Sequence, residues 1–385
     1  MEGQFWKNQP VGLCKTGKDH IGVIEKGSVE KVSQVPLQLP DNLSWKTVEA
    51  TDEKMLENLA NYLNSHYVSD KDGNFRLTYN VPFLRHFIAE GMKGWSVVII
   101  DTHENIVGSI TAVRRDLIIR GVETHRSAEV NLLCVRKDYR GKNLAGTLIS
   151  EIRRIIGLDG FFTAIHTSGS VLPQKPFCSS RYFHKLLDVK KCNAAGFTEF
   201  SEDDLPSAIK QHQFKPIKKT LNPICSWILR YANEKDIPNV ATLFANDASR
   251  YHVTEDINSE VLSSFLVAPY LDNFVIEEIN MIGRKRKVVG FVSIYHMDLF
   301  CSKANEFLAT SYIHYHCGTI LPCIGEIFAL LQKKGKSVVN CFNMGTNKDI
   351  IQAYGLMPGT GNLHYYMYNY KLPVLPTEEL SYMVL

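Results

Sequence analysis

The sequence predicts an α/β protein in which one arrangement of strands and helices occurs twice. Strand-like runs alternate with amphipathic helices along the chain, a pattern typical of a mixed sheet flanked by helices. Four pairs of segments recur at one spacing. A polar, proline-bearing stretch separates the two occurrences, so we expect two halves of similar architecture.

The repeat begins with two strand-to-helix segments. Trp45 opens WKTVEATDEKMLENLANYL and Trp227 opens WILRYANEKDIPNVATLF, a spacing of 182 residues (from position 45 to position 227). Val107 in VGSITAV and Val289 in VGFVSIY have the same spacing. Two further pairs share it: 129–135 with 311–317, and 161–163 with 343–345. Because identities are sparse, the pattern indicates duplicated architecture rather than a close sequence repeat.

Two amphipathic helices are predicted at equivalent places in the halves. Their apolar residues recur at helical spacing, and these are Leu144, Leu148, Ile152 and Ile155 in one helix and Leu321, Ile324, Phe328 and Leu331 in the other. Gly157 stands where the first helix is expected to stop, and Gly335 follows the second. Lys333 and Lys334 suit the last turn of the second helix, where the helix dipole favours cations.

Composition excludes several classes of protein. Hydrophobic residues make up 45% and charged residues 22%, which rules out a disordered chain. A formal net charge of +3 gives no argument for nucleic-acid binding, and we expect none. The longest apolar runs, such as 97–100, are far too short for a membrane helix, and the opening MEGQFWKNQP lacks the apolar core of a signal peptide. We therefore expect a cytoplasmic protein without stable membrane insertion.

The cysteines indicate a reducing compartment. There are nine, an odd number, and no two form a C-x-x-C pair. Disulfides and a structural zinc are therefore not expected, and we predict no metal site.

The most informative chemistry follows one predicted strand. Residues 129–145 read EVNLLCVRKDYRGKNLA: an apolar strand ends near Val135, a basic loop follows, and a helix begins near Asn143. Backbone N–H groups at a helix start beside basic side chains suit a phosphate-bearing ligand. The segment 140–145 also matches the R-x-x-G-x-A signature of acyl-CoA-dependent N-acyltransferases, with Asn143 in the glycine place. Taken alone, this loop could equally be a solvated basic loop.

Further motifs extend from residue 4 to the C-terminus. QFWKNQPV at 4–11 resembles one family's FWxTQPV, and the segment 129–145 resembles its EINFLCVxKxLRSKRLA. Leu172-Pro173 followed by RYFHKL at 181–186 resembles LPxxxxxxRYxHRxL, and PGTGNLHYYMYNY at 358–370 resembles GxGDGxLxYYLYNW. The sequence thus resembles the glycylpeptide N-tetradecanoyltransferases, the N-myristoyltransferase family.

The resemblance implies a fold as well as an activity. The family has two pseudo-symmetric acyltransferase-like (GNAT) halves that form a mixed, continuous, saddle-shaped sheet flanked by helices. The polar stretch 211–223 is the predicted junction. Residues 1–210 would then form the half with the myristoyl-CoA site. Residues 211–385 would form the half with most of the peptide groove and the terminal carboxylate.

The implied reaction is direct and uses no acyl-enzyme. The N-terminal glycine amine of a protein attacks the thioester of myristoyl-CoA, which is a co-substrate, so no cofactor is expected. Backbone amides of Leu132 and Leu133 would polarise the thioester carbonyl; removal of one donor from a comparable oxyanion hole costs ~2.7–4 kcal/mol. The proton acceptor would be the free C-terminal carboxylate of Leu385. A frayed terminus is the alternative, which the apolar end Met383-Val384-Leu385 disfavours.

The family motifs also imply the donor site. It consists of Gln4, Phe5 and Trp6 near the N-terminus, the strand residues Leu133, Cys134 and Val135, and the loop residues Arg140, Gly141, Lys142, Asn143, Leu144 and Ala145. Gly141 and Asn143 replace a serine and a basic residue of the family. Weaker phosphate contacts are therefore expected.

The implied peptide groove carries more departures. It consists of Tyr67, Asp70, Asp72, Phe75, Asn131, Thr167, Gly169, Tyr182, His184, Ser311, Thr360, Gly361 and Leu363. Asp70 and Asp72 fall on acidic positions that receive a substrate lysine, although without the family they would form an ordinary polar loop. Thr360 replaces the aspartate of G-x-G-D-G and is the most serious departure.

Four tempting sites are better explained by packing. Cys134 has no base placed near it by sequence, so a buried strand thiol is favoured over a nucleophile. His314 and His316 with Cys317 resemble a metal pair, but two ligands without a third are usually polar strand residues. Tyr365, Tyr366, Tyr368 and Tyr370 suit strand packing rather than base stacking. His184 would be a hydrogen-bonded core histidine outside the family context.

Two other functions stay open. One is a different acyl-CoA N-acyltransferase, such as an acetyltransferase of small amines, which acyl-chain preference would reveal. The other is a non-catalytic acyl-CoA or peptide-binding relative, which the altered SYMVL tail and Thr360 keep under consideration. For the N-myristoyltransferase interpretation we expect a monomer whose partners are myristoyl-CoA and the N-terminal glycine peptides of proteins.

Overall fold

The computed structural model describes residues 2–14, 21–67, 69, 72–120, 124–214, 220–222, 225–280 and 285–384. Helices and one large mixed sheet of fifteen strands make up these residues, which confirms the predicted α/β class. Two smaller sheets of two and three strands accompany the large one.

The helices alternate with strands along the chain. The α-helices are α1 (Glu2–Lys7), α2 (Glu53–His66), α3 (Val81–Ala89), α4 (Leu144–Leu158), α5 (Val189–Ala194), α6 (Leu205–His212), α7 (Ile237–Ala248), α8 (Ser259–Val267), α9 (Leu321–Lys333) and α10 (Asn347–Tyr354). Short 3₁₀ helices are η1 (Val29–Lys31), η2 (Lys137–Tyr139), η3 (Glu234–Asp236) and η4 (Thr377–Glu379).

The strands are described in two series, one from each half of the sequence. The first series is β1 (Gly22–Val23), β2 (Leu43–Thr47), β3 (Phe75–Leu77), β4 (Ser96–Asp101), β5 (Ile106–Ile119), β6 (His125–Val135), β7 (Ala164–Ser168) and β8 (Cys178–Leu186). The second is β9 (Thr220–Asn222), β10 (Cys225–Tyr231), β11 (Val253–Glu255), β12 (Leu271–Asn280), β13 (Lys285–His296), β14 (Leu299–Cys301), β15 (Glu306–Leu308), β16 (Thr310–Gly318), β17 (Val338–Phe342), β18 (Met357–Tyr368), β19 (Tyr370–Lys371) and β20 (Leu380–Ser381).

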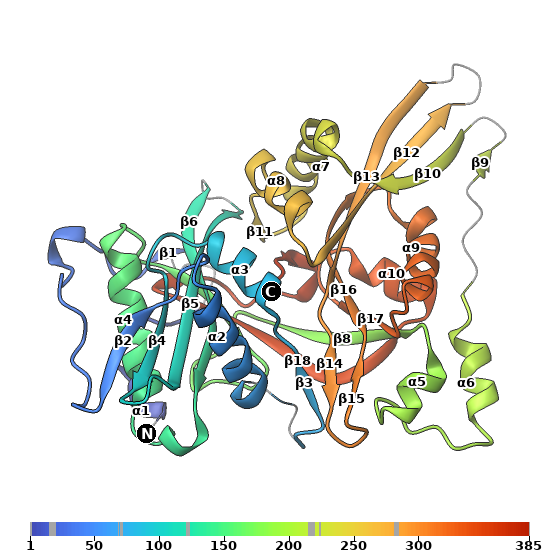
Figure 1. Cartoon of the computed structure of the whole chain (residues 1–385). Coiled ribbons are helices and arrows are strands. Elements are labelled where there is room, and N and C mark those ends of the chain that lie inside the picture. The colour runs from blue at the N-terminus through green and yellow to red at the C-terminus, as the bar shows by residue number, and fades with distance from the viewer. Residues whose placement is uncertain are drawn as a thin grey trace.

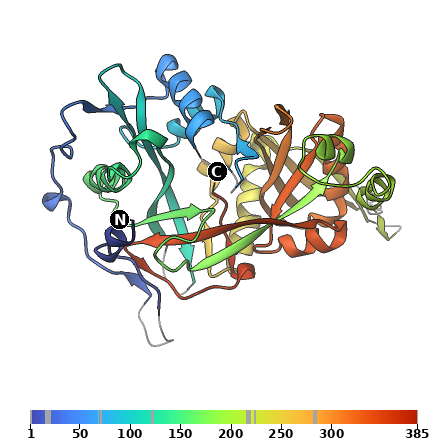
Figure 2. The ribbon, with the colours of Figure 1, turned by 90° about the horizontal axis from the view of Figure 1, so that it is seen from below.

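The large sheet joins the halves by exchanging a strand. Its order is β2-β4-β5-β6-β7-β18-β8-β17-β16-β13-β12-β10-β9. The last long strand of the second series, β18, pairs with β7 of the first, while β8 of the first pairs with β17 of the second. Figure 2 shows β18 crossing the middle of the molecule from one half to the other. The helix α4 flanks the first set of strands, and α9 and α10 flank the second (Figure 1).

The predicted repeat is confirmed for three of its four pairs. The Trp45 and Trp227 segments form β2 with α2 and β10 with α7, and the paired strands are β5 with β13 and β6 with β16. The pairing of 161–163 with 343–345 is wrong, because the first segment precedes β7 whereas the second follows β17. The basic loop between β6 and α4 spans 136–143, but only 319–320 separate β16 from α9. This difference shifts the later elements out of the 182-residue spacing.

Both predicted helices form as expected. α4 ends at Leu158, one residue past the predicted stop. α9 ends at Lys333, and Gly335 has φ +79°, the left-handed conformation of a C-terminal stop. The apolar faces of both helices pack on the sheet. Leu148 and Ile152 of α4 are buried, and so are Ile324 and Phe328 of α9.

The largest core cluster lies between the halves. It contains side chains from α2, α3, β5, β6, β16 and β18 together with the chain end, including Leu380, Tyr382 and Met383. Each of these three tail residues is at most 2% exposed. The described tail is therefore packed rather than frayed as far as Val384, which is half-buried.

The predicted domain boundary remains a prediction. The division between residues 210 and 211 falls in the last turn of α6. Because β8 and β18 are exchanged, a cut in the sequence does not separate the sheet into two parts of contiguous chain.

Candidate active site

Strand β6 contains a β-bulge in its middle. The paired residues on either side are Ser109 with Cys134 and Thr111 with Asn131. Leu132 and Leu133 therefore lie opposite Ile110 alone, and a bulge leaves one residue unpaired in the ladder. Leu132 has φ +51°, which is uncommon for a residue other than glycine. The bulge is thus the point of β6 at which the strand ladder is interrupted, and there the Leu132 backbone is hydrogen-bonded to the Tyr67 hydroxyl.

Three hydroxyl groups hold the bulge from both sides. Ser109 Oγ donates a 2.8 Å hydrogen bond to the Leu132 carbonyl, and Thr111 Oγ1 donates one of 3.2 Å to the Asn131 carbonyl. From α2, the Tyr62 hydroxyl donates to the Cys134 carbonyl at 3.1 Å. The predicted oxyanion amides therefore sit in a segment whose carbonyls are fixed by side chains.

The loop after β6 has the backbone geometry of its motif. Gly141 has φ +81° and Asn143, directly before α4, has φ +60° and ψ 15°. This left-handed conformation is easiest for glycine and is tolerated by asparagine. Asn143 can therefore replace the glycine of R-x-x-G-x-A without changing the path of the chain. Leu144 and Ala145 open the first turn of α4, where N–H groups lack helical partners.

Among the described residues, three of the loop's four cations form no ion pair: Lys137, Arg140 and Lys142. The fourth, Arg136, is held by Asp138 at 2.9 Å. Arg140 Nε instead donates to the Val135 carbonyl at 3.0 Å, and the Lys142 ammonium lies over the Tyr139 ring at 4.4 Å. Their charge thus stands beside the start of α4, where it can meet an anion.

The N-terminal residues lie beside the same helix. α1 contains Gln4, Phe5 and Trp6. The Phe5 ring lies close to Gly146 of α4. A Cβ added at Gly146 would lie 3.2 Å from that ring. The Trp6 ring stacks on His166 with centroids 5.8 Å apart. The structure therefore brings the N-terminal part of the predicted donor site to α4.

The equivalent place in the second half is filled. The Gly318 amide donates a 2.8 Å hydrogen bond to the Asp247 carboxylate, so a side chain of the protein takes the place that an anion would take. A hollow of about 140 Å³ lies beside it, lined by residues that include Asp247, Arg250 and Asp349. Of the two halves, only the first therefore has a basic loop with unpaired cations at this place among the described residues.

The predicted groove residues form a run of aromatic contacts. Tyr182 and His184 stack on one face of β8 with centroids 6.4 Å apart. Phe197, which the motifs did not single out, contacts His184 at 5.1 Å and Phe75 at 5.7 Å. The half-buried Tyr67 and Tyr182 both pack against the central cluster. The only sequence signal for Phe197 was a large aromatic residue shortly after α5.

The glycines of the last motif pack on this run. Pro358 pairs with Phe183 and Asn362 with Arg181, so the residues Gly359, Thr360 and Gly361 lie opposite Tyr182 in a bulge. A Cβ at Gly359 would lie 2.2 Å from His184 Nε2, and one at Gly361 would lie 3.1 Å from the Tyr182 ring. Only glycine permits this approach, which places the exposed Thr360 at the turn of the bulge.

The remaining groove residues are distributed over three strands. Thr167 lies half-buried on β7 opposite Tyr365, and Gly169 is exposed just after that strand. Leu363 of β18 packs on the central cluster. Asn131 is buried beside the bulge and donates its amide to Glu129.

The acidic loop is described in part. Asp72 is exposed just before β3, whereas Asp70 lies outside the described residues. The strand that follows, β3, pairs with β14 in a small sheet, which fixes the end of the loop to the second half.

Ser311 does not face the groove. Its hydroxyl contacts His296 Nδ1 at 2.9 Å, and its strand neighbour Ile313 belongs to the core under α9. Because side chains alternate along a strand, Tyr312 takes the groove side instead. The prediction of a groove role for Ser311 is wrong in this respect: it lies on the opposite face of the sheet.

The discounted sites are explained by packing. Cys134 is 4% exposed and burial raises the pKa of its thiol, which disfavours a thiolate nucleophile. His314 contacts Ser293 and His316 contacts Asn347. The four tyrosines of β18 and its continuation are all at most 8% exposed. The described part of the chain contains no group of three or more His, Cys, Asp or Glu side chains that could hold a metal ion.

A buried charge cluster behind the bulge was not predicted. Arg115 of β5 forms ion pairs with Glu129 at 3.2 Å, Glu90 at 3.4 Å and Glu255 at 3.5 Å. Burial raises the pKa of Glu255 to about 7. Burial would also raise that of Glu90, but hydrogen bonds and the Arg115 charge lower its pKa to about 2. The sequence did contain a signal for this cluster, because charged residues interrupt apolar strands in ITAVRRDLII and AEVNLLCV.

The predicted proton acceptor follows the last described residue of the chain. Leu385 lies outside the described residues, which end at Val384. The tail before it contacts both halves: Tyr382 donates to Glu129 of β6, and the Met383 amide donates to Tyr315 of β16 at 2.9 Å.

Comparison with known proteins identifies the family. Two family models match the chain in sequence: the N-terminal domain of myristoyl-CoA:protein N-myristoyltransferase over residues 23–179 and its C-terminal domain over residues 196–381. The chain belongs to the N-myristoyltransferase family.

Relatives of this N-myristoyltransferase family match along nearly the whole chain. Glycylpeptide N-tetradecanoyltransferase 2 of Danio rerio is 29% identical and covers 98% of this chain and 76% of its own length. Glycylpeptide N-tetradecanoyltransferase 1 of Arabidopsis thaliana is 28% identical, and the match covers 99% of this chain and 89% of the relative. The crystal structure of the Saccharomyces cerevisiae N-myristoyltransferase with bound myristoyl-CoA has the same fold, with a TM-score of 0.86, 24% identity and coverage of 96% and 93%. The fold predicted from the family is thereby confirmed. Within the described part of the chain, no helix has the length and apolar character needed to span a membrane.

Proposed function

We propose that this chain transfers the myristoyl group of myristoyl-CoA to the N-terminal glycine amine of proteins. Its membership of the N-myristoyltransferase family supports this, as does its likeness to a yeast enzyme with bound myristoyl-CoA. The observation that carries the proposal is one continuous segment, residues 131–145. There a bulge that interrupts the strand ladder is followed by a basic loop and a helix start, and among the described residues Arg140 and Lys142 of that loop form no ion pair.

In the proposed reaction the glycine nitrogen attacks the thioester carbonyl. A carbon–nitrogen bond forms, the carbon–sulfur bond breaks, and CoA leaves as a thiolate. The amides of Leu132 and Leu133 stabilise the negative charge that develops on the carbonyl oxygen. Arg140, Lys142 and the first turn of α4 bind the CoA phosphates. The left-handed conformation of Asn143 gives the loop this path without a glycine.

The amine must lose a proton to react. An α-amine has a pKa of ~7.7–8.0, so much of it is protonated at neutral pH. We assign the proton acceptor to the terminal carboxylate of Leu385. The packed tail supports this, since Tyr382 and Met383 are buried between the bulge strand and the second half.

The peptide is proposed to lie along the aromatic run of Tyr67, Tyr182 and His184. Asp70 and Asp72 would receive a substrate lysine, and Thr360, on the bulge of β18, would weaken the hold on the peptide relative to an aspartate. We further propose that the protein acts as a cytoplasmic monomer. Residues 1–210 would form the half with the myristoyl-CoA site, and residues 211–385 would form the half that completes the peptide groove at Thr360 and carries the terminal carboxylate.

Turnover of myristoyl-CoA with Gly-starting peptides tests this function. Acylated peptide would be separated by chromatography, with the matched peptide starting in Ala as control and acetyl-CoA as the competing donor. We expect acylation of the Gly peptide alone, with myristoyl-CoA strongly preferred. Preference for acetyl-CoA and small amines would indicate a different N-acyltransferase. Binding of myristoyl-CoA without turnover would indicate a non-catalytic relative.

The terminal carboxylate has its own test. A chain extended by one residue past Leu385 moves the charge and leaves the donor loop untouched, whereas Leu385→Met keeps the carboxylate. Extension should lower kcat by ~10²–10⁴-fold, the range of general-base effects, with little change in myristoyl-CoA affinity. Equal losses in the two variants would point to packing of the tail instead, and full activity of the extended chain would exclude this proton acceptor.

A further inference from the structure

The last described residues are fixed by strand pairing. β20 runs parallel to β11, with Leu380 beside Val253 and Ser381 beside Thr254. Directly after it, the Tyr365 hydroxyl donates to the Tyr382 carbonyl at 3.1 Å. The chain thus reaches Tyr382 in one defined path.

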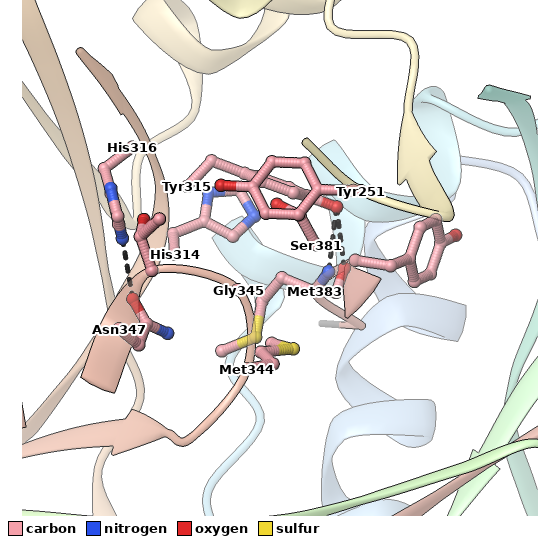
Figure 3. A pocket seen from close by; sticks show the side chains of 11 residues that line it. Tyr251, His314, Tyr315, His316, Met344, Gly345, Asn347, Ser381 and Met383 are labelled. Atoms are coloured by element: carbon pink, nitrogen blue, oxygen red, sulfur yellow. Dashed lines mark hydrogen bonds between the residues drawn. The ribbon is translucent and has the colours of Figure 1, made fainter. Parts of the chain in front are cut away.

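Tyr315 then holds the next residue. Its hydroxyl oxygen accepts the Met383 amide at 2.9 Å and donates its own proton to the Glu255 carboxylate at 2.6 Å. Figure 3 shows Tyr315 and Met383 beside a small cavity. Its volume is about 20 Å³, room for roughly one water molecule. A tail packed this closely cannot shift by much without breaking the bond to Tyr315.

Tyr382 makes the matching contact on the other half. Its hydroxyl donates to Glu129, whose second oxygen accepts the side-chain amide of Asn131. Asn131 directly precedes the Leu132 bulge. The tail and the predicted oxyanion amides are therefore tied to the same carboxylate.

One guanidinium joins the two contacts. Arg115 lies 3.2 Å from Glu129 and 3.5 Å from Glu255, the partners of Tyr382 and Tyr315 respectively. The side chains of both carboxylates are at most 5% exposed. Buried charges of this kind are costly to maintain and can serve to fix one geometry. Here they fix the chain end from two directions.

We propose that Tyr315 and Tyr382, held by Glu255, Glu129 and Arg115, are positioning residues that set where the chain ends relative to the Leu132 bulge. The inference rests on the proposed role of the terminal carboxylate. These tyrosines act through the tail and contact neither the acyl donor nor the peptide. Loss of either hydroxyl is expected to displace the proton acceptor and to leave the phosphate-binding loop 136–143 intact.

A double-mutant cycle tests this assignment. Tyr315→Phe would be made in the full chain and in a chain that lacks Leu385, and kcat and KM would be measured for both substrates. The matched control is Tyr354→Phe, because Tyr354 is also buried and its hydroxyl also accepts one amide, that of Gly325, and donates once, to the Leu321 carbonyl. Tyr354 lies between α9 and α10, far from the tail in the fold.

We expect Tyr315→Phe to lower kcat by roughly ten- to a hundredfold in the full chain with KM for myristoyl-CoA unchanged, since small misplacements of a catalytic group cost this much. In the chain without Leu385 it should cause no further loss. Tyr382→Phe should behave in the same way, and Tyr354→Phe should leave kcat unchanged. Since Tyr382→Phe removes a different hydroxyl, it tests the assignment even if Tyr315→Phe does not fold.

The outcomes separate this inference from the proposed function. Equal loss of kcat from Tyr315→Phe and Tyr382→Phe with and without Leu385 would overturn the positioning role and leave the terminal carboxylate in place. Full activity of the chain without Leu385 would overturn both. A rise in KM for myristoyl-CoA in either tyrosine variant would place the tyrosines in the donor site instead.

Discussion

The hydroxyl of Ser109 donates a 2.8 Å hydrogen bond to the carbonyl of Leu132, whose φ is +51°. A non-glycine residue held in the left-handed region costs of order 1–3 kcal/mol and persists where its surroundings determine it. The Ser109 hydroxyl is 0% exposed and supplies this constraint from the neighbouring strand. The geometry of the proposed oxyanion site thus depends on a side chain that does not belong to it.

Ser109→Ala should therefore affect both stability and activity. The buried Leu132 carbonyl loses its side-chain donor, which costs about 1–3 kcal/mol. Relaxation of the bulge moves the two amides, so kcat should fall by roughly tenfold or more, below the ~10²–10³ cost of losing an oxyanion donor outright. Urea unfolding and steady-state kinetics would measure the two effects.

Ser127→Ala is the matched control for that variant, because Ser127 is an equally buried serine on β6 at the end away from the bulge. It should lower stability without lowering kcat. If Ser109→Ala loses stability but keeps full kcat, the bulge amides are not part of the reaction.

Replacement of Asn143 tests the phosphate loop. Asn143→Gly should keep CoA affinity, because φ +60° is accessible to glycine without strain. Asn143→Val should weaken CoA binding by roughly tenfold, since the left-handed conformation costs other L-residues ~1–2 kcal/mol. Titration calorimetry with CoA would measure both. Equal affinities in the two variants would mean that the loop geometry does not contribute to binding.

Arg140 should contribute to CoA binding mainly by charge. Arg140→Ala should lower CoA affinity more at low than at high salt, because screening weakens interactions between exposed charges. Lys137→Ala, a neighbouring exposed cation, serves as control and should have a smaller effect. Arg140→Lys should retain part of the affinity, although it loses the fork that reaches the Val135 and His66 carbonyls. Unchanged affinity of Arg140→Ala at both salt concentrations would remove the loop from the site.

Glu255 should give the folded protein a pH-dependent stability near neutrality. Burial raises its pKa from 4.5 to about 7, so the fold favours the protonated form. Its contribution to stability is complete below the unfolded pKa and is lost as pH rises through about 7, a change of up to about 3 kcal/mol. Glu255→Gln cannot titrate and should flatten the fall in unfolding free energy between about pH 5 and pH 8. If the unfolding free energy falls by the same amount in both proteins, Glu255 does not titrate in this pH range.

The sequence was informative where interactions are local. The ends of α4 and α9 follow from apolar spacing and from the glycines Gly157 and Gly335, which stand at or just past each helix end. The loop 136–143 was predicted from its own basic residues and from the R-x-x-G-x-A match, with Asn143 in the glycine place. The repeat, too, was visible as spacing, and it failed at 161–163 only after the longer loop had displaced later elements.

The pairing register of the strands could not be predicted from the sequence. Ser311 was predicted to face the groove, but the strand alternation places Tyr312 there and turns Ser311 toward His296. A one-residue change of register moves every side chain to the other face of a sheet, and bulges make such changes in both halves. No periodic pattern in the chain marks where a bulge occurs.

The family, the α/β class and the basic loop before α4 could all be predicted from short motifs and local patterns, because each motif depends on residues close together in the chain. Only the tertiary structure brought Arg115, Glu129, Glu255, Tyr315 and Tyr382 into one cluster, since they come from five separate strands and segments. The exchange of β8 and β18 likewise depends on pairing between distant strands. Burial makes each of these charges and hydroxyls seek a partner, and which partner it finds is decided by the fold of the whole chain.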